Sequence, residues 1–141
     1  MSPDAYSAAI DLLGKRAMFS GALIGRLEGM NFAPADIAQA LERLKARGLL
    51  SDEALAASLA EREQSKKHAS RQRISEKLES MGAPSEVIET VLAALPEDSV
   101  TAEAALASKR LVSTAAAGRY LARLGFEDTV IESALEGAFQ H

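Results

Sequence analysis

The hydrophobic residues of this chain follow a pattern that occurs three times. In each copy the apolar positions are spaced by four and three residues, cross a gap of seven, and continue with spacings of four and three. Spacings of three and four keep one face of an α-helix apolar, and the gap of seven fits a short turn, so each copy predicts a helical hairpin. We expect these side chains to face the core. They are Leu23, Leu27, Met30, Ile37, Leu41 and Leu44; Ile74, Leu78, Met81, Ile88, Leu92 and Leu95; and Ala117, Leu121, Leu124, Ile131, Leu135 and Ala138.

An additional helix is predicted ahead of each hairpin, so that one unit contains three helices. In the first unit this helix covers about residues 4–17. Ser20 is the predicted N-cap of the second helix, because its hydroxyl can accept a hydrogen bond from an unpaired backbone N–H group. Pro34 suits the first turn of the third helix, and Gly48 is expected to end it.

The second unit opens at Ser51, where Asp52 and Glu53 place negative charge at the positive end of a helix dipole. Ser70 is the predicted N-cap of its second helix. The distance from Arg62 to this cap is about one helical turn longer than the corresponding distance in the other two units. A turn at residues 97–99 is expected to lead into the third unit.

The fold class is therefore all-α, with three tandem three-helix repeats. The predicted units are residues 1–50, residues 51–96, which include a basic stretch, and residues 97–141. A repeat of this size indicates stacked modules, each of which completes its core against its neighbour.

Composition limits the chemistry that this chain can perform. It has no Cys and two His residues, His68 and His141, so we expect no metal site, no cofactor and no nucleophilic triad. The sequence contains no glycine-rich phosphate loop, and its carboxylates are spread along predicted helix faces. It shows no apolar run of membrane-spanning length and no basic signal start, which predicts a cytoplasmic protein without membrane contact. We therefore expect a protein that is not an enzyme.

The charge distribution provides one candidate functional surface. The formal net charge is -4, yet residues 62–77 hold six basic and two acidic side chains. Such a stretch can follow phosphate groups or steer the protein onto an acidic partner. A solvated helix face paired with neighbouring glutamates, such as Glu63 and Glu76, is the alternative. No aromatic residue lies among these cations, which argues against stacking on single-stranded bases.

Several segments, in this order, resemble the RecX family of regulators of the RecA recombinase. The resemblance spans nearly the whole chain, and its most specific part is the glycine-leucine-leucine-x-aspartate junction at Gly48–Asp52. The matching segments are Ala9–Arg16 followed by Ser20, Leu23 and Leu27; Leu44–Asp52 with Ala56; and Arg73–Ile74 with Leu78, Met81–Gly82 and Ile88.

This resemblance implies an elongated, curved stack of three-helix repeats that binds RecA and RecA–DNA filaments. It further implies a monomer that modulates the recombinase, ATPase and co-protease activities of RecA in DNA repair and the SOS response. The expected effect is inhibition. Weak direct contact with DNA is a further expectation. A helical DNA-binding module and a structural adaptor for a different protein remain the alternatives. The candidate contact residues are Arg43, Arg47, Arg62, Lys66, Lys67, Arg71, Arg73 and Lys77.

Overall fold

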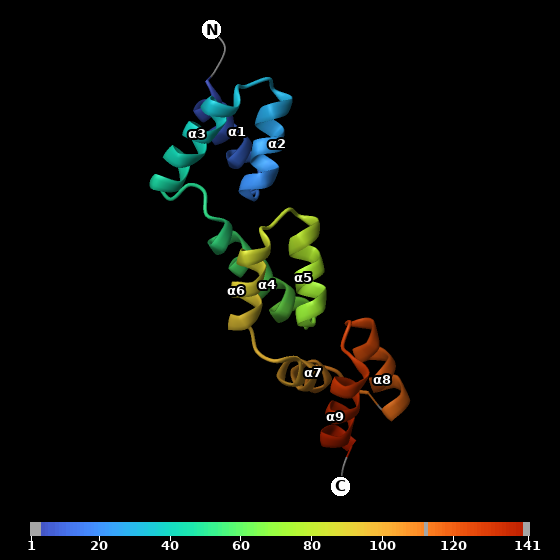
Figure 1. Ribbon diagram of the computed structural model, residues 1–141. Coiled ribbons are helices and arrows are strands. Elements are labelled where there is room, and N and C mark those ends of the chain that lie inside the picture. The colour runs from blue at the N-terminus through green and yellow to red at the C-terminus, as the bar shows by residue number, and fades with distance from the viewer. Residues whose placement is uncertain (1–3, 112, 140–141) are drawn as a thin grey trace.

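The computed structural model describes residues 4–111 and 113–139, and within these ranges it contains helices and no strand. Figure 1 shows an elongated body with α1–α3 at one end, α4–α6 in the middle and α7–α9 at the other end. We refer to these groups as units 1, 2 and 3. The helices are α1 (Ala5–Lys15), α2 (Ser20–Gly29), α3 (Pro34–Ala46), α4 (Asp52–Lys67), α5 (Arg71–Ser80), α6 (Ser85–Ala94), α7 (Asp98–Ala107), α8 (Thr114–Arg123) and α9 (Asp128–Phe139). The predicted all-α fold is confirmed over this part of the chain.

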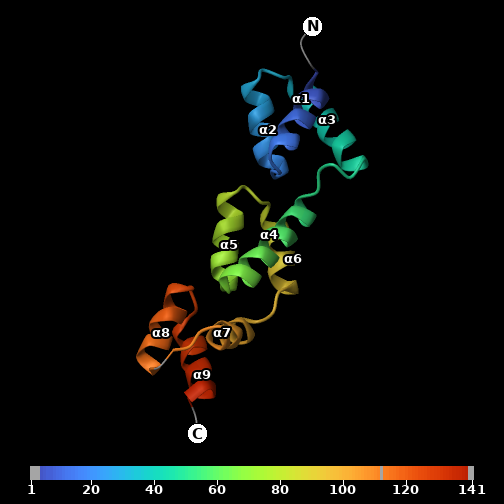
Figure 2. The ribbon, with the colours of Figure 1, turned by 180° about the vertical axis from the view of Figure 1, so that it is seen from behind.

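Each unit has its own cluster of buried apolar side chains. The first and third helices of a unit pack against each other, and the second helix packs against both. In Figure 2, which shows the molecule from behind, α4 lies in front of α6 and beside α5. The buried side chains include Leu23, Leu27, Ile37, Leu41 and Leu44 in unit 1; Ile74, Leu78, Val87, Ile88 and Val91 in unit 2; and Ala117, Leu121, Ile131 and Ala134 in unit 3.

Two positions of the hydrophobic pattern are exposed, contrary to prediction. Met30 is 48% exposed because it lies at the C-cap of α2, beyond the last position that faces α1 and α3. Ala138 lies in the last turn of α9 and lines an open groove between α7 and α9, where no neighbouring helix covers it. The pattern therefore identifies the core-facing side of the hairpins but extends slightly too far at two helix ends.

The turn between the second and third helices has the same geometry in every unit. Its central residue has a positive φ angle: 68° at Asn31, 87° at Gly82 and 94° at Gly125. The following N–H group donates to a buried leucine carbonyl one turn back, in the Schellman arrangement that closes a helix end. These bonds run from Phe32 to Leu27 (3.3 Å), from Ala83 to Leu78 (3.0 Å) and from Phe126 to Leu121 (3.3 Å).

The helix starts agree with the predicted caps at Ser51 and Ser70, whose hydroxyls accept from backbone N–H groups. The predicted N-cap at Ser20 is wrong, because Phe19 occupies the cap and Ser20 is the first residue of α2. The turn expected at residues 97–99 is also shifted, since Asp98 already begins α7. In both places a hydrogen bond to a distant part of the chain is present: Ser20 donates to the Asp52 carboxylate, and the Asp98 carboxylate accepts from the main-chain N–H of Arg71.

The extra length predicted between Arg62 and Ser70 lies in the first helix of unit 2. Helix α4 has 16 residues, whereas α1 has 11 and α7 has 10. Its last turn carries Lys66 and Lys67, and His68 ends it in the left-handed conformation with φ 49°. Over the described ranges, no helix combines the length and the apolar character needed to cross a membrane.

Candidate interaction surface

Two of the predicted basic residues in unit 2 share one carboxylate. The Glu63 side chain in α4 is 13% exposed, and its Oε1 lies 2.7 Å from Lys77 Nζ and 3.5 Å from Lys67 Nζ. Burial raises the pKa of Glu63, but the hydrogen bond and charge of Lys77, with the charge of Lys67, outweigh that effect and hold the pKa below its ordinary value. Lys67 and Lys77 are therefore partly neutralised where they stand.

Arg71 has a structural role at the junction between units 2 and 3. Its Nε donates to the carbonyl of Pro96 (3.2 Å) and its Nη2 to the carbonyl of Leu95 (2.5 Å), which are backbone groups at the end of α6. Its main-chain N–H donates to Asp98 Oδ1 at 2.9 Å. The sequence analysis names Arg71 as a candidate contact residue, and in the folded chain its guanidinium also holds the segment that connects α6 to α7.

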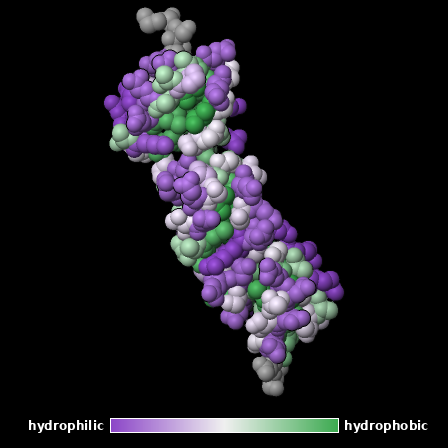
Figure 3. Space-filling model, viewed as in Figure 1, coloured by the Kyte–Doolittle hydropathy of each residue, from purple (hydrophilic) through white to green (hydrophobic). Residues whose placement is uncertain are grey.

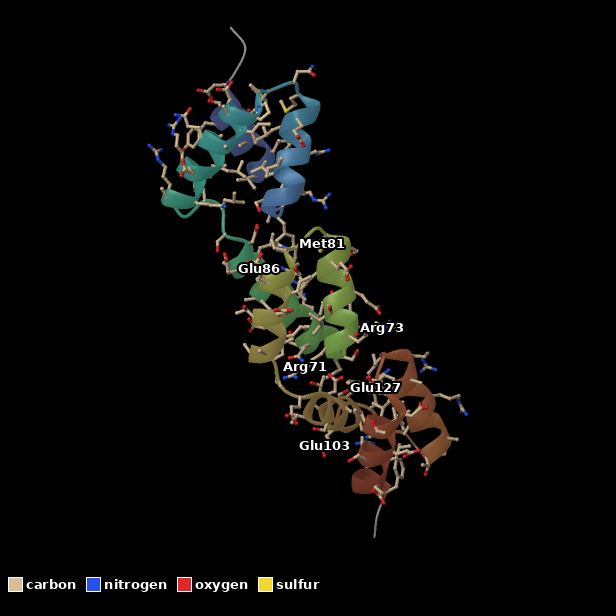
Figure 4. All side chains as sticks on the ribbon, viewed as in Figure 1. Arg71, Arg73, Met81, Glu86, Glu103 and Glu127 are labelled. Carbon is tan, nitrogen blue, oxygen red and sulfur yellow. The ribbon has the colours of Figure 1, made fainter. Side chains whose placement is uncertain are left out.

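Arg62, Lys66 and Arg73 are exposed and form no salt bridge with the described residues, whereas Lys67 is also exposed but pairs with Glu63. Arg62 and Lys66 are separated by one turn of α4 and therefore lie on one face of it. Arg73 lies near the start of α5, on the side of unit 3, as Figure 4 shows. These three side chains form the part of the predicted basic stretch that is best placed to contact a partner.

Arg43 and Arg47 lie in unit 1, apart from this stretch. The guanidinium carbon of Arg43 lies 3.8 Å from the centre of the Tyr6 ring, and that of Arg47 lies 5.6 Å from it. Cation–π contacts of this kind attach the end of α3 to α1. The eight candidate residues thus do not form one continuous surface.

The junctions between units depend on two aspartates whose role the sequence analysis missed. Asp52, the first residue of α4, accepts from the main-chain N–H of Ser20 (2.8 Å) and from its hydroxyl (2.5 Å). Asp98, the first residue of α7, accepts from the main-chain N–H of Arg71. Ser20 and Arg71 are the first residues of α2 and α5. Each aspartate therefore satisfies the N-terminus of the second helix of the preceding unit.

Phe19 strengthens the first junction. It belongs to the connection between α1 and α2 in unit 1, but its side chain is fully buried in the core of unit 2 with Ile74 and Leu78. For the contacts of the two aspartates, the only sequence signal was that an aspartate recurs at the start of a unit. That recurrence does not reveal a hydrogen bond to a helix that begins about 30 residues earlier.

Polar and apolar side chains are unevenly distributed on the face seen in Figure 3. Hydrophobic residues gather over unit 1 and along the middle of unit 2, and hydrophilic residues predominate at the edges and between units 2 and 3. The packing of the helices within each unit and the two junctions define the class of protein. It is an elongated all-helical protein built from three coupled three-helix units.

Within that class, the fold is the RecX fold. A crystal structure of RecX from Lactobacillus salivarius matches it with a TM-score of 0.77 and 18% sequence identity, covering 97% of this chain and 96% of that chain. A crystal structure described as regulatory protein RecX matches with a TM-score of 0.67 and 18% identity, covering 91% of this chain and 69% of that one. By sequence, no protein-family model and no curated protein matches the chain.

Proposed function

We propose that this chain is a regulator of the RecA recombinase that binds RecA–DNA filaments and inhibits their activity. The observation that carries this proposal is the nearly end-to-end structural match to RecX from Lactobacillus salivarius. A second solved structure of the same fold is described as a regulatory protein. The sequence segments that resemble the RecX family, above all Gly48–Asp52, support the same conclusion.

The architecture suits a protein that lies along a filament. Asp52, Asp98 and Phe19 couple successive units, so that contacts made by different units can act together on one partner. Binding by several linked surfaces increases the total affinity without requiring strong contacts at any one of them. An elongated stack can therefore contact more than one subunit of a polymer.

Within the proposed complex, the exposed cations Arg62, Lys66 and Arg73 attract the filament, with a smaller contribution from Lys67 and Lys77. Exposed charges act mainly on the rate of encounter, and each one is individually weak. Arg71 contributes through the structure of the second junction. Arg43 and Arg47 provide a separate basic site on unit 1.

The test measures DNA-dependent ATP hydrolysis by RecA as the protein is added. The wild-type chain should lower the rate, and the effect should weaken as salt rises. The double variant Arg62→Glu/Lys66→Glu should need several-fold more protein for the same inhibition. The matched control is Arg119→Glu/Arg123→Glu, which reverses two exposed cations with the same spacing on α8 and should inhibit like the wild type.

The outcomes separate this function from the alternatives. A chain that neither binds RecA filaments nor alters ATP hydrolysis contradicts the proposal and favours an adaptor for a different protein. Binding to bare DNA that falls steeply with salt, without an effect specific to RecA, favours a DNA-binding module. Equal inhibition by the wild type and the Arg62/Lys66 variant would remove this face from the mechanism while leaving RecA regulation intact.

A further inference from the structure

A groove lies at the junction between units 1 and 2 and plays no part in the function proposed above. Residues 16–19 and the first turns of α2 form one wall, and Ser80 and Met81 at the end of α5 form the other. Its volume is about 330 Å³. Figure 4 shows Met81 at the end of α5 that faces unit 1. A space of this size can hold one or two amino-acid side chains of a partner.

The corresponding place at the junction between units 2 and 3 is covered. Arg73 is the third residue of α5, and its side chain lies so close to Gly125 that a Cβ atom added there would be 2.5 Å from Arg73 Cγ. The third residue of α2 is Ala22, which is too short to cover the equivalent glycine, Gly82. A Cβ atom added to Gly82 would meet no neighbouring atom within 4 Å. The groove is therefore open because Ala22 stands where the next unit has an arginine.

The walls of the groove combine an apolar floor with a basic rim. Phe19 is fully buried beneath it, and Met18 and Met81 are partly buried. Arg16 and Arg26 are exposed on the rim, and no acidic residue is among the residues that line the groove. An apolar side chain can displace water from such a floor while a neighbouring carboxylate pairs with an arginine.

We propose that this groove binds a short segment of a protein partner in which apolar residues are flanked by carboxylates. A nucleic-acid backbone could use the arginines but would leave the apolar floor without a partner, so the combination favours a peptide. The bonds from Ser20 to Asp52 and the buried Phe19 hold the two walls together. A preformed site of this kind loses little conformational freedom when a ligand binds.

The test uses the full chain labelled with ¹⁵N and an acetylated tetrapeptide, Asp-Leu-Leu-Asp, titrated by NMR. Saturable shifts are expected in the amides of residues 16–26 and 80–82. Ala22→Arg, which introduces the residue that covers the other junction, should weaken binding at least about tenfold. The control Ala115→Arg makes the same change at an exposed position near the start of α8 and should bind like the wild type. The amide spectra verify that both variants are folded.

Two further probes identify the chemistry. The peptide Asn-Leu-Leu-Asn should bind several-fold more weakly, and Asp-Gly-Gly-Asp should give no saturable shifts at the groove. If a short DNA duplex saturates the same amides while Asp-Leu-Leu-Asp does not, the groove is a nucleic-acid site and the proposal is wrong. Equal binding by the wild type and Ala22→Arg also overturns it. Because no probe contains RecA, these results are independent of the proposed regulatory function.

Discussion

Replacing Asp52 by Ala should weaken the first junction and destabilise the whole chain. The Asp52 carboxylate accepts two hydrogen bonds from Ser20, at 2.8 and 2.5 Å, and the site is partly buried. A hydrogen bond to a charged group contributes about 1.5–3 kcal/mol, and water entering the gap would recover some of that energy. We therefore expect the variant to lose about 2–3 kcal/mol of unfolding free energy, a substantial fraction of the about 5–15 kcal/mol typical of a native protein.

A matched variant isolates the junction from the helix dipole. Glu53→Ala removes an acidic side chain from the same first turn of α4, where it makes only a long contact of 3.4 Å with the Ser51 hydroxyl. It should lose no more than about 1 kcal/mol, the usual size of the dipole effect. Asp52→Asn should fall between the two, because the amide oxygen can still accept from the Ser20 N–H group.

Urea unfolding monitored by circular dichroism at 222 nm measures all three variants. The wild type and Glu53→Ala should have similar midpoints, and Asp52→Ala should unfold at clearly lower urea. A broadened transition for Asp52→Ala would indicate that unit 1 unfolds before the rest, as happens when the interface between repeats is weakened. If Asp52→Ala and Glu53→Ala lose the same amount, the contribution assigned to this junction is wrong.

Three further predictions concern unit 2 and its junction with unit 3. Leu78→Ala should cost about 2–5 kcal/mol because its side chain is fully buried, whereas Glu79→Ala on the surface should be nearly neutral; equal denaturation midpoints would refute the assigned helix register. Gly125→Ala should lower the unfolding free energy more than Gly82→Ala. Both positions have a positive φ angle, which costs an alanine about 1–2 kcal/mol, but only at Gly125 does the added Cβ atom meet a side chain of α5. The pKa of Glu63 lies below its ordinary value of 4.5, so its stabilising effect is present above that value and is lost as the pH falls through the lower pKa of the folded state. Glu63→Gln should therefore lower the unfolding free energy by under about 1 kcal/mol at neutral pH, and the difference from the wild type should become smaller in acid. A difference in unfolding free energy that does not change with pH would contradict the assigned ion pairs.

The hairpins were predictable from sequence because their signals are local. The spacing of Leu23 and Leu27, or of Ile74 and Leu78, reports a helix face directly, and the glycine at position 82 reports the turn that follows. Errors arose where a distant partner decides the outcome. Ser20 has a side chain that is favoured at an N-cap, but its hydroxyl donates a hydrogen bond to the Asp52 carboxylate, and Phe19 occupies the cap.

The candidate surface was less predictable than the fold because charge in a sequence does not reveal how it is used. Six cations between residues 62 and 77 appear equivalent in the sequence. In the folded chain, Arg71 binds backbone carbonyls and Lys77 binds Glu63, while Arg62 and Lys66 remain exposed. The groove beside Ala22 could not be predicted from the sequence either. It depends on a small residue at a junction between two units, and the two sides of that junction come together only in the folded chain.

For the N-termini of α2 and α5, units 1 and 2 each depend on an aspartate of the unit that follows. In α2 the N-cap Phe19 supplies no side-chain bond, whereas Ser70 and Ser113 cap α5 and α8 with their own hydroxyls. Unit 1 therefore relies most on a residue of its successor, Asp52. During synthesis the N-terminal unit emerges first, and its second helix remains without this bond until the start of α4 has left the ribosome. The first unit therefore completes its hydrogen bonding only after the start of the second unit has been synthesised.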